Sequence, residues 1–374
     1  MTVTTPRADR APTVAAALAG LPRVVDLLAA RAQEHDRDAT FPYQGVEAVH
    51  EAGLLTLTVA QRYGGPGGGL ADTVTVLSGL GRGDASVAVL AACTLLCHAE
   101  QGRTGAWPAA VYRKLLTESR RGPTLLNLLR TEPGSAGTLP GTVARRDGER
   151  WLLTGRKTGC AGAEALAWMA VPARTEEPEP RTGLFLLRGD GPGIEIDPVW
   201  DQLGLRASAG HDVVLAEAPA TAVLGLAAPG ATDPLETAWH DLAFAAVHLG
   251  VARAAQEWLV RFLTPRAGEP ARHRSALGEL EGALVVAEEL LAGLAARIDR
   301  GEAGATGRTG PARLHVIRTA TATVQQAVTL TGTQGLSRRH PLERHLRDVL
   351  SGHGHFPAED ATVDALAQAA LDRR

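Results

Sequence analysis

Between residues 125 and 225 the chain reads LLRTEPG at 128–134, WLLTGRK at 151–157 and LGLRAS at 203–208. Short apolar runs alternate in this stretch with Gly, Pro and turn pairs such as Asp147-Gly148. Apolar runs of this kind between such residues are typical of antiparallel strands joined by tight turns. The sequence therefore predicts a β module in the middle of the chain.

Long Ala- and Leu-rich segments with helical periodicity lie on both sides of this module. We expect helices before it at Thr13–Asp36, Gln44–Ala52, Leu70–Arg82 and Ser86–Gly102, and after it at Asp233–Leu263, Arg274–Arg300, Pro311–Thr331, Pro341–Leu350 and Ala361–Leu371. Short loops between the later helices favour an antiparallel bundle. The predicted class is α+β, with an N-terminal helical domain (1–124), a central β domain (125–226) and a C-terminal helical bundle (227–374).

Composition narrows the class of protein. The chain has 374 residues, 45% of them hydrophobic, and a mean hydropathy of −0.03, which is the composition of a globular protein. A net charge of −3 argues against a general nucleic-acid binder. No apolar run approaches the ~18 residues of a membrane span, and Met1–Arg7 lacks the pattern of a signal peptide. Three cysteines without framework spacing fit a reducing compartment, so we expect a cytoplasmic protein with no membrane partner.

Two local patterns favour a structural role over ligand binding. The Gly-rich stretch Tyr63–Gly69 does not have the G-x-G-x-x-G or P-loop spacing after a strand, so it reads as a wide turn between helices. Cys93, Cys97 and His98 lie close together in the sequence but lack a fourth metal ligand. We interpret them as small buried side chains and predict no metal site.

The motifs together resemble the acyl-CoA dehydrogenase superfamily in order and spacing across nearly the whole chain. Besides the three central pieces, the matching segments are Phe41-Pro42, Glu51-Ala52-Gly53-Leu54, Tyr63-Gly64-Gly65, Gly83-Asp84-Ala85-Ser86-Val87, Gly335-Leu336-Ser337, His340-Pro341-Leu342-Glu343-Arg344 and Arg347-Asp348. By this resemblance the fold is an N-terminal helical domain, a central antiparallel β-barrel domain and a C-terminal four-helix bundle. The resemblance also implies FAD, held at a subunit interface of a homodimer or homotetramer.

The family's chemistry implies an activity. A carboxylate removes the α-proton of an acyl thioester while the flavin takes hydride from the β-carbon. We therefore expect a flavin-dependent oxidoreductase that acts on an unusual acyl thioester, bound to CoA or to an acyl carrier protein, in bacterial secondary metabolism. Its further partner would be an electron acceptor.

Positions for cofactor and substrate follow from the same resemblance. Flavin contacts are expected at Leu129, Thr131, Gly137, Gly159, Ala161 and Gly332, and substrate contacts at Arg206 and Ser208. The family's Ser after Thr-Glu-Pro-Gly is replaced by Ala136-Gly137-Thr138, and its aromatic-x-Thr by Gly159-Cys160-Ala161. These small residues leave room for a bulky group. Arg206 has an alternative interpretation as an ion-pair residue of a β-hairpin.

The catalytic base departs from the family pattern. The usual Glu, nine residues after Arg347, is replaced by Phe356, which cannot accept a proton. Some relatives carry the base near the start of the helix that follows the β domain, which here corresponds to His240, with Asp241 next to it. An imidazole titrates near neutral pH. The alternative is that His240 is an ordinary helix histidine.

A second branch of the superfamily gives an alternative function. Its flavin monooxygenases use reduced FMN or FAD supplied by a reductase, lack the Glu base, and several carry a His shortly after the same Arg. His355, eight residues after Arg347, resembles that His, although in a Gly-rich loop it could also simply face solvent. A third hypothesis is a non-redox enzyme or scaffold that kept the fold and lost the flavin, because several usual flavin contacts are missing.

Overall fold

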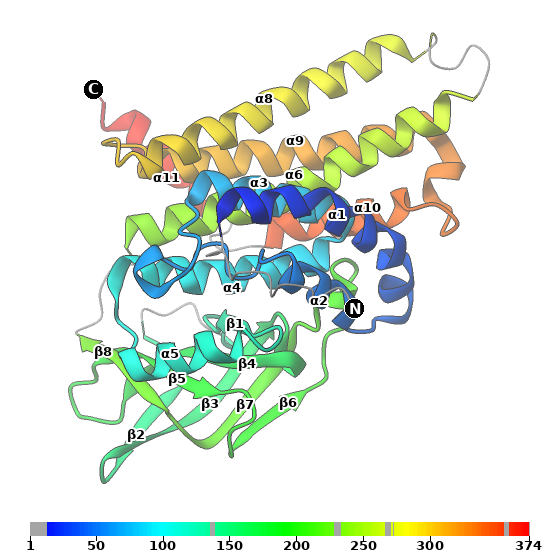
Figure 1. Ribbon diagram of the computed structural model, residues 1–374. Coiled ribbons are helices and arrows are strands. Elements are labelled where there is room, and N and C mark those ends of the chain that lie inside the picture. Colours follow the sequence, from blue (N-terminus) through cyan, green and yellow to red (C-terminus); the bar gives the residue numbers. More distant parts are fainter. Residues whose placement is uncertain are drawn as a thin grey trace, which may run out of the picture.

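The computed structural model describes residues 13–134, 139–227, 233–265, 271, 273–354 and 359–373. The helices are α1 (Val14–Asp38), α2 (Tyr43–Glu51), α3 (Leu70–Gly83), α4 (Ala85–Thr104), α5 (Ala109–Glu118), α6 (Pro234–Leu263), α8 (Arg274–Asp299), α9 (Thr309–Thr331), α10 (Leu342–Leu350) and α11 (Glu359–Leu371). The strands form a layer at one end of the molecule; α4 lies next to them, then α3 and α6, then α8 and α9 (Figure 1). The bounds of these helices confirm each helix that the sequence predicted, to within a few residues at the ends.

Helix α5 was not predicted. It begins after Pro108, which presets the backbone for the first helical turn. Its buried residues Tyr112 and Leu115 pack with Trp107 and Trp168 in a small cluster beside the sheet. The helix is short and half exposed, so its apolar positions are too few to give a strong periodic signal.

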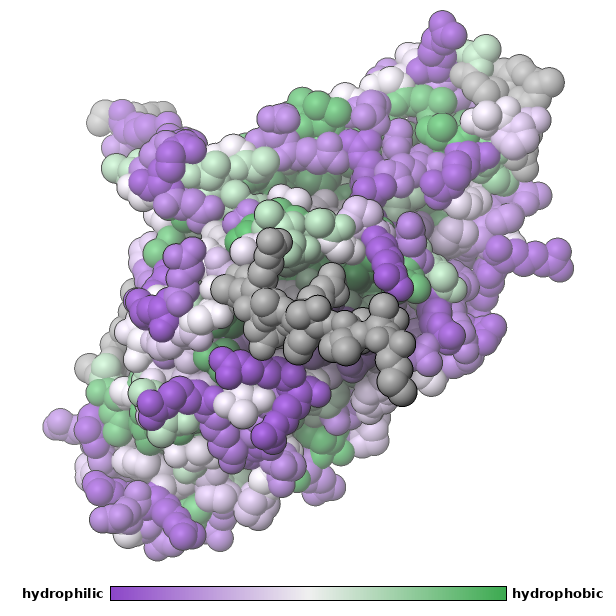
Figure 2. Space-filling model, in the orientation of Figure 1, coloured by the Kyte–Doolittle hydropathy of each residue, from purple (hydrophilic) through white to green (hydrophobic). Residues whose placement is uncertain are grey.

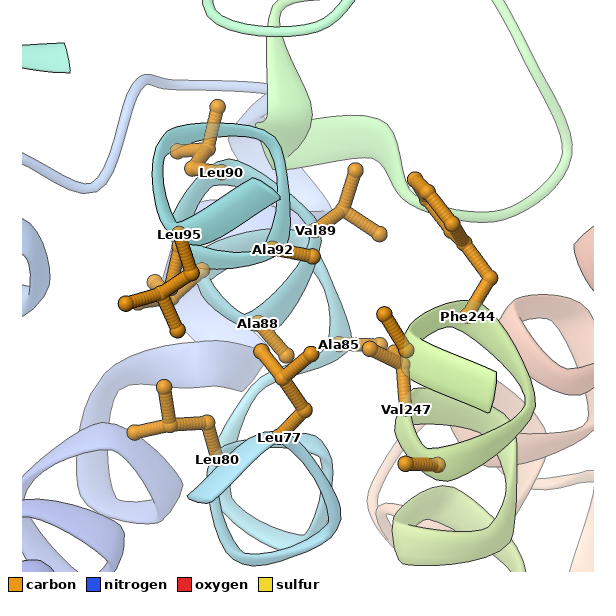
Figure 3. Close-up of a cluster of buried hydrophobic side chains, with 14 of the residues drawn as sticks. Leu77, Leu80, Ala85, Ala88, Val89, Leu90, Ala92, Leu95, Phe244 and Val247 are labelled. Atoms are coloured by element: carbon orange, nitrogen blue, oxygen red, sulfur yellow. The ribbon is translucent and has the colours of Figure 1, made fainter. Parts of the chain in front are cut away.

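Helix α4 is the central helix of the fold. Asp84 caps it by accepting a hydrogen bond from the Ser86 amide at 2.8 Å. Within the described residues, α4 is the helix that is long and apolar enough to cross a membrane, but 72% of that window is buried inside the protein. Figure 3 shows its side chains packed against Leu77 and Leu80 of α3 and Val247 of α6. A helix that is apolar on all sides in this way is a core helix.

The strands form one sheet with the order β6-β7-β3-β2-β4-β5-β8, and β1 pairs with β4. Their bounds are β1 (Leu125–Leu128), β2 (Val143–Asp147), β3 (Arg150–Cys160), β4 (Leu166–Thr175), β5 (Thr182–Arg188), β6 (Ile194–Asp197), β7 (His211–Pro219) and β8 (Ala222–Ala227). The β2–β3 hairpin turns at Gly148, whose φ is 59°, as the Asp147-Gly148 pair predicted.

Two features of the sheet correct the expectation of an antiparallel barrel. Strand β4 pairs in parallel with both β1 and β2, because the chain reverses at the β2–β3 hairpin and again between β3 and β4 and so returns to the direction of β2. In the described part of the chain, the end strands β6 and β8 pair with β7 and β5 and not with each other. The sheet is therefore open and mixed.

The two helical parts share one core. A Cβ added at Gly250 of α6 would lie 2.1 Å from the Ser78 carbonyl oxygen of α3, and one at Gly81 would lie 2.3 Å from the Val247 carbonyl oxygen. Such close approach requires glycine on both helices. Polar residues gather over the outer helices and over the far end of the sheet on the face shown in Figure 2.

Candidate functional site

The ends of β1 and β3 lie side by side and form a strip of backbone, which we call the sheet wall (Leu129–Thr131 and Gly159–Ala161). The Thr158 amide donates to the Thr131 carbonyl at 2.9 Å, and Asn127 Nδ2 donates to the Ala161 carbonyl at 3.0 Å. The structure thus brings together Leu129, Thr131, Gly159 and Ala161, four of the predicted cofactor residues.

A buried ion pair stands behind the sheet wall. Lys157 Nζ donates to Glu132 Oε1 at 2.5 Å and to the Pro172 carbonyl at 2.7 Å, and the two charged side chains are 0% and 4% exposed. Burial works to raise the pKa of Glu132, but hydrogen bonds from Lys157, Thr142 and Gly141 outweigh it and hold that pKa below its usual range. The pair therefore stays ionised and joins the chain after β1 to β3.

Helix α4 turns one partly exposed face toward the same region. Cys93, Leu96, Cys97 and Glu100 are half-buried, whereas most other α4 residues are buried. Their spacing of three and four residues puts them on one side of the helix, which we call the α4 face. Burial raises the pKa of Cys97, on which the charges of Arg130, Glu100 and Glu236 also act, so this face borders the end of β1 and the start of α6. Burial raises the pKa of Cys93 to about 12, and both thiols stay protonated.

Helix α6 supplies the third side. Glu236, His240 and Phe244 follow at intervals of four residues and form the α6 face. Glu236 makes an ion pair with Arg130 of the sheet wall, which shows the direction in which this face points. The rings of His240 and Phe244 lie 4.5 Å apart, and Figure 3 shows Phe244 projecting toward Val89 of α4. His240 is half-buried on this face.

Asp241 is held in a different contact. Its Oδ1 lies 3.1 Å from Arg313 Nε, its Oδ2 accepts from Thr309 Oγ1 at 2.9 Å, and both charged side chains are 2% exposed. Burial raises the pKa of this carboxyl group. The Asp241 side chain therefore joins α6 to α9 and does not belong to the α6 face.

The predicted substrate residues lie in the turn before β7. Arg206 Nε donates to the Asp36 carbonyl at 2.8 Å, and Arg206 makes an ion pair with Asp201 at 3.6 Å. It belongs to a 3-10 turn, η3 (Arg206–Ser208), and not to a hairpin. Ser208 is buried, and its carbonyl accepts from the Gly162 amide at 2.8 Å, directly behind the sheet wall. Ser208 thus supports the wall, whereas Arg206 joins this turn to α1.

The remaining predicted positions lie elsewhere. Gly332 ends α9, which is separated from the sheet by the α3 and α6 layer (Figure 1). Gly137, His355 and Phe356 lie outside the described residues. His98 is buried, with Nδ1 2.9 Å from the Tyr112 hydroxyl, and no three His, Cys, Asp or Glu side chains gather as metal ligands in the described ranges.

The sheet wall fits the ring of a flavin. Gly159 is exposed, has φ of 61°, and a Cβ added there would meet no atom within 4 Å, so the space beside it is open. The neighbouring side chains are small, namely the half-buried Ala161 and the buried Cys160. A flat conjugated ring can lie against such a strip, with the exposed Thr131 at its edge.

Comparison with known proteins identifies the family. Three family models match successive parts of the chain: acyl-CoA dehydrogenase N-terminal domain at residues 24–102, middle domain at 128–218 and C-terminal domain at 242–359. A putative acyl-CoA dehydrogenase, YdbM of Bacillus subtilis, is 30% identical over 94% of this chain and 95% of its own length. The chain belongs to the acyl-CoA dehydrogenase family.

Other relatives within the acyl-CoA dehydrogenase fold carry a different activity in their names. An L-evernosamine nitrososynthase from a Micromonospora species is 30% identical over 88% of this chain and 85% of its own length. The solved structure of KijD3 in complex with FMN and dTDP-3-amino-2,3,6-trideoxy-4-keto-3-methyl-D-glucose is 28% identical, with a TM-score of 0.85 over 96% of this chain and 94% of that one. A putative dehydrogenase and a nitrososynthase are thus both among the relatives of this chain.

Several site residues were not found by sequence reasoning. Arg130 and Glu236 bridge the sheet wall and α6, and the α4 face carries Cys97 and Glu100. The spacing of the α4 face was readable, but on an otherwise apolar helix it is indistinguishable from a core stripe. The Arg130–Glu236 contact joins residues 106 positions apart and has no local signal.

Proposed function

We propose that this protein is a flavin-dependent monooxygenase that uses reduced flavin and molecular oxygen to hydroxylate the amino group of a nucleotide-linked amino sugar. The nitrososynthase relatives and the FMN-bound KijD3 complex, which holds a dTDP-linked amino sugar, support this substrate class. The reduced flavin would come from a reductase partner.

The observation that carries the proposal is the pairing of the carboxylates around the site. Dehydrogenation of an acyl thioester requires a carboxylate base, and a carboxylate held by a cation or buried away from the substrate is a poor one. Five acidic side chains around the three faces each have a cationic partner: Glu100 with Arg103, Glu132 with Lys157, Asp212 with Arg156, Glu236 with Arg130 and Asp241 with Arg313. Asp233, at the start of α6, caps that helix by accepting a hydrogen bond from the Leu235 amide.

The residues present can support oxygen transfer instead. The sheet wall, Leu129–Thr131 with Gly159–Ala161, would hold a reduced flavin, which would supply the two electrons for an oxygen transfer in which one oxygen atom enters an N–H bond of the amine and the other leaves as water. His240 can hold and return the proton that this exchange requires. The buried Phe244, behind His240 on the α6 face, keeps water from the inner end of the site.

The test is oxygen uptake with FMN, a flavin reductase and candidate amino sugars, with catalase present to correct for peroxide. We expect oxygen uptake that depends on the amine. The rate of this uptake should fall about hundredfold or more in His240→Gln, because that is the usual effect of removing a general acid or base. His315→Gln, which changes an exposed histidine of α9, is the matched control. Uptake that does not depend on the amine, or equal effects of both variants, would refute the proposal.

Oxidation of an acyl thioester is the second candidate, because YdbM, a putative acyl-CoA dehydrogenase, resembles this chain over 94% of its length. In that case His240 would be the base. The two candidates differ in their need for oxygen, since a dehydrogenase reduces its flavin with substrate alone. Bleaching of the bound flavin by an acyl-CoA without oxygen would favour the second candidate.

A further inference from the structure

The segment Gly204–Ala209, before β7, is held in an unusual backbone conformation. Leu205 has φ of 52° and Ala209 has φ of 45°, in the left-handed region that side chains other than glycine avoid. Such residues persist only where surrounding contacts hold them. The contacts come from two sides, and they join parts of the protein that are far apart in sequence.

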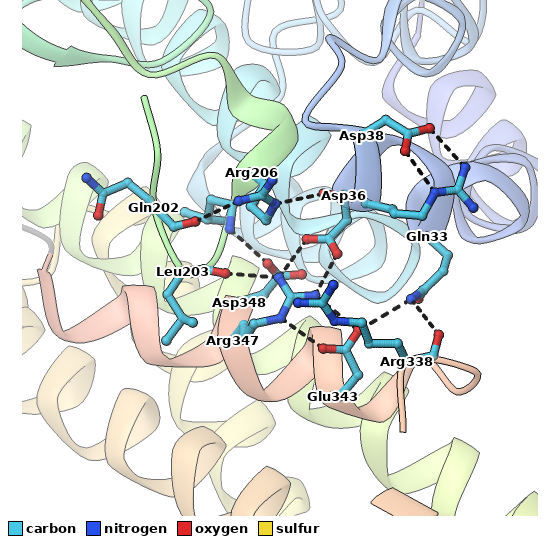
Figure 4. A network of polar contacts seen from close by, with 12 residues as sticks. Gln33, Asp36, Asp38, Gln202, Leu203, Arg206, Arg338, Glu343, Arg347 and Asp348 are labelled. Carbon is cyan, nitrogen blue, oxygen red and sulfur yellow. Dashed lines mark hydrogen bonds and ion pairs between the residues drawn. The ribbon is translucent and has the colours of Figure 1, made fainter. Parts of the chain in front are cut away.

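On one side, the segment is fixed to α10 and α1 (Figure 4). The Leu205 amide donates to Asp348 Oδ1 at 2.8 Å, and Arg206 Nε donates to the Asp36 carbonyl at 2.8 Å. A Cβ added at Gly204 would lie 2.2 Å from the Arg347 carbonyl oxygen, so the two backbones are in direct contact. Asp348 thus holds the start of the strained segment.

On the other side, the segment supports the sheet wall. The Ser208 carbonyl accepts from the Gly162 amide at 2.8 Å, and the Ala209 carbonyl accepts from the Ala163 amide at 3.1 Å. Gly162 directly follows Ala161, the last residue of the wall. A shift of the segment is therefore transmitted to the backbone that faces the flavin.

Asp348 lies among several charges. It is 4% exposed, and Arg344 of the same helix, Asp36 of α1 and Asp84 at the start of α4 act on it. Arg347 forms ion pairs with Asp36 and Glu343. Burial raises the pKa of Asp348 to about 7; Arg344 and the hydrogen bond from the Leu205 amide oppose this effect but do not outweigh it. The charge of Asp348 therefore changes in the neutral range.

We propose that Asp348 is a positioning residue for the flavin, which acts through the Leu205–Ala209 segment on the backbone of Gly159–Ala161. The proposal requires only that a flavin binds at the sheet wall and does not depend on which reaction follows. Ionisation of Asp348 favours a state in which the segment detaches and water reaches the carboxylate, because the pKa of the hydrated carboxyl group is lower than that of the buried one. The segment therefore holds the wall most firmly while Asp348 is protonated.

The test measures binding of oxidised FMN by fluorescence quenching and amide exchange of residues 158–165, both at pH 6 and pH 8. In the wild type we expect FMN binding up to about tenfold weaker at pH 8, with lower protection of these amides once each exchange rate is divided by the intrinsic rate at the same pH, because one pH unit above the pKa leaves the ionised form in tenfold excess. Asp348→Asn, which keeps an acceptor for the Leu205 amide without a charge, should bind FMN equally at both pH values. Asp348→Leu removes the acceptor and should weaken binding about tenfold at pH 6.

The matched control is Asp299→Leu. Asp299 accepts hydrogen bonds from the Leu70 and Ala71 amides, the same kind of contact, but between α8 and α3. An equal loss of FMN binding in Asp299→Leu and Asp348→Leu would overturn the proposal. If Asp348→Leu does not fold, the Asn variant decides: a pH dependence that persists in Asp348→Asn would overturn it as well. Because FMN binding is measured without turnover, failure of the monooxygenase reaction leaves this test intact.

Discussion

The ion pair between Lys157 and Glu132 permits a sharp prediction. Lys157→Met removes the ammonium group and leaves the Glu132 carboxylate 4% exposed, where Thr142 and the Gly141 amide still donate to it but no longer with a neighbouring positive charge from Lys157. Removal of one partner of a buried pair costs about 3–5 kcal/mol, because the other charge stays buried without compensation. We expect a loss of this size in the free energy of unfolding, and weaker flavin binding, since the pair holds Thr131 against Thr158.

The assay is denaturant unfolding followed by the fluorescence of the six tryptophans. The double variant Glu132→Gln, Lys157→Met should recover part of the loss, which gives the coupling energy in a double-mutant cycle. Arg181→Met, which breaks the exposed pair with Glu177, is the control and should change little. A loss below about 1 kcal/mol in Lys157→Met would refute the role of a buried pair behind the sheet wall.

Three further predictions concern packing, backbone and pH. Gly250→Ala should destabilise the fold by about 3 kcal/mol, because its Cβ would lie 2.1 Å from the Ser78 carbonyl oxygen; an unchanged melting temperature would contradict the α3–α6 contact. Ala209→Gly should raise the free energy of unfolding by up to about 1 kcal/mol by relieving φ of 45°, and a clear loss of stability would count against strain there. The raised pKa of Asp348 means that folding stability falls as pH rises from its ordinary value of 3.8 to about 7, by up to about 4 kcal/mol. Calorimetry of Asp348→Asn should show a flatter pH profile, and a profile like that of the wild type would exclude Asp348 as the source.

The fold was predictable because its signals are local and repeated. The helical periods and the Asp147-Gly148 turn each specify an element by themselves, and the motif order specifies the family. The open, mixed sheet was not predictable, since whether β6 and β8 meet depends on strand twist and packing and not on strand pattern.

The motif order predicted which backbone segments come together. The family resemblance placed Leu129, Thr131, Gly159 and Ala161 at one site, and the structure brings these four residues together in the sheet wall, whereas their contact with a flavin and the role of His240 stay predictions. The partners of charged side chains were not predictable. The sequence allowed Asp241 to be a catalytic base beside His240. Its ion-pair partner Arg313 lies 72 positions later on α9, and no sequence pattern around either residue predicts the pair. Arg206 likewise contacts the Asp36 carbonyl, which only the tertiary fold brings near.

The central claim is that oxygen, and not an acyl thioester, is the reactant that meets the flavin at the sheet wall. The most direct measurement supplies the protein with reduced FMN, a nucleotide-linked amino sugar and ¹⁸O₂, and determines the mass of the product. The account predicts one ¹⁸O atom bound to the amine nitrogen. A product that carries no ¹⁸O, together with reduction of the bound flavin by an acyl-CoA in the absence of oxygen, would contradict it.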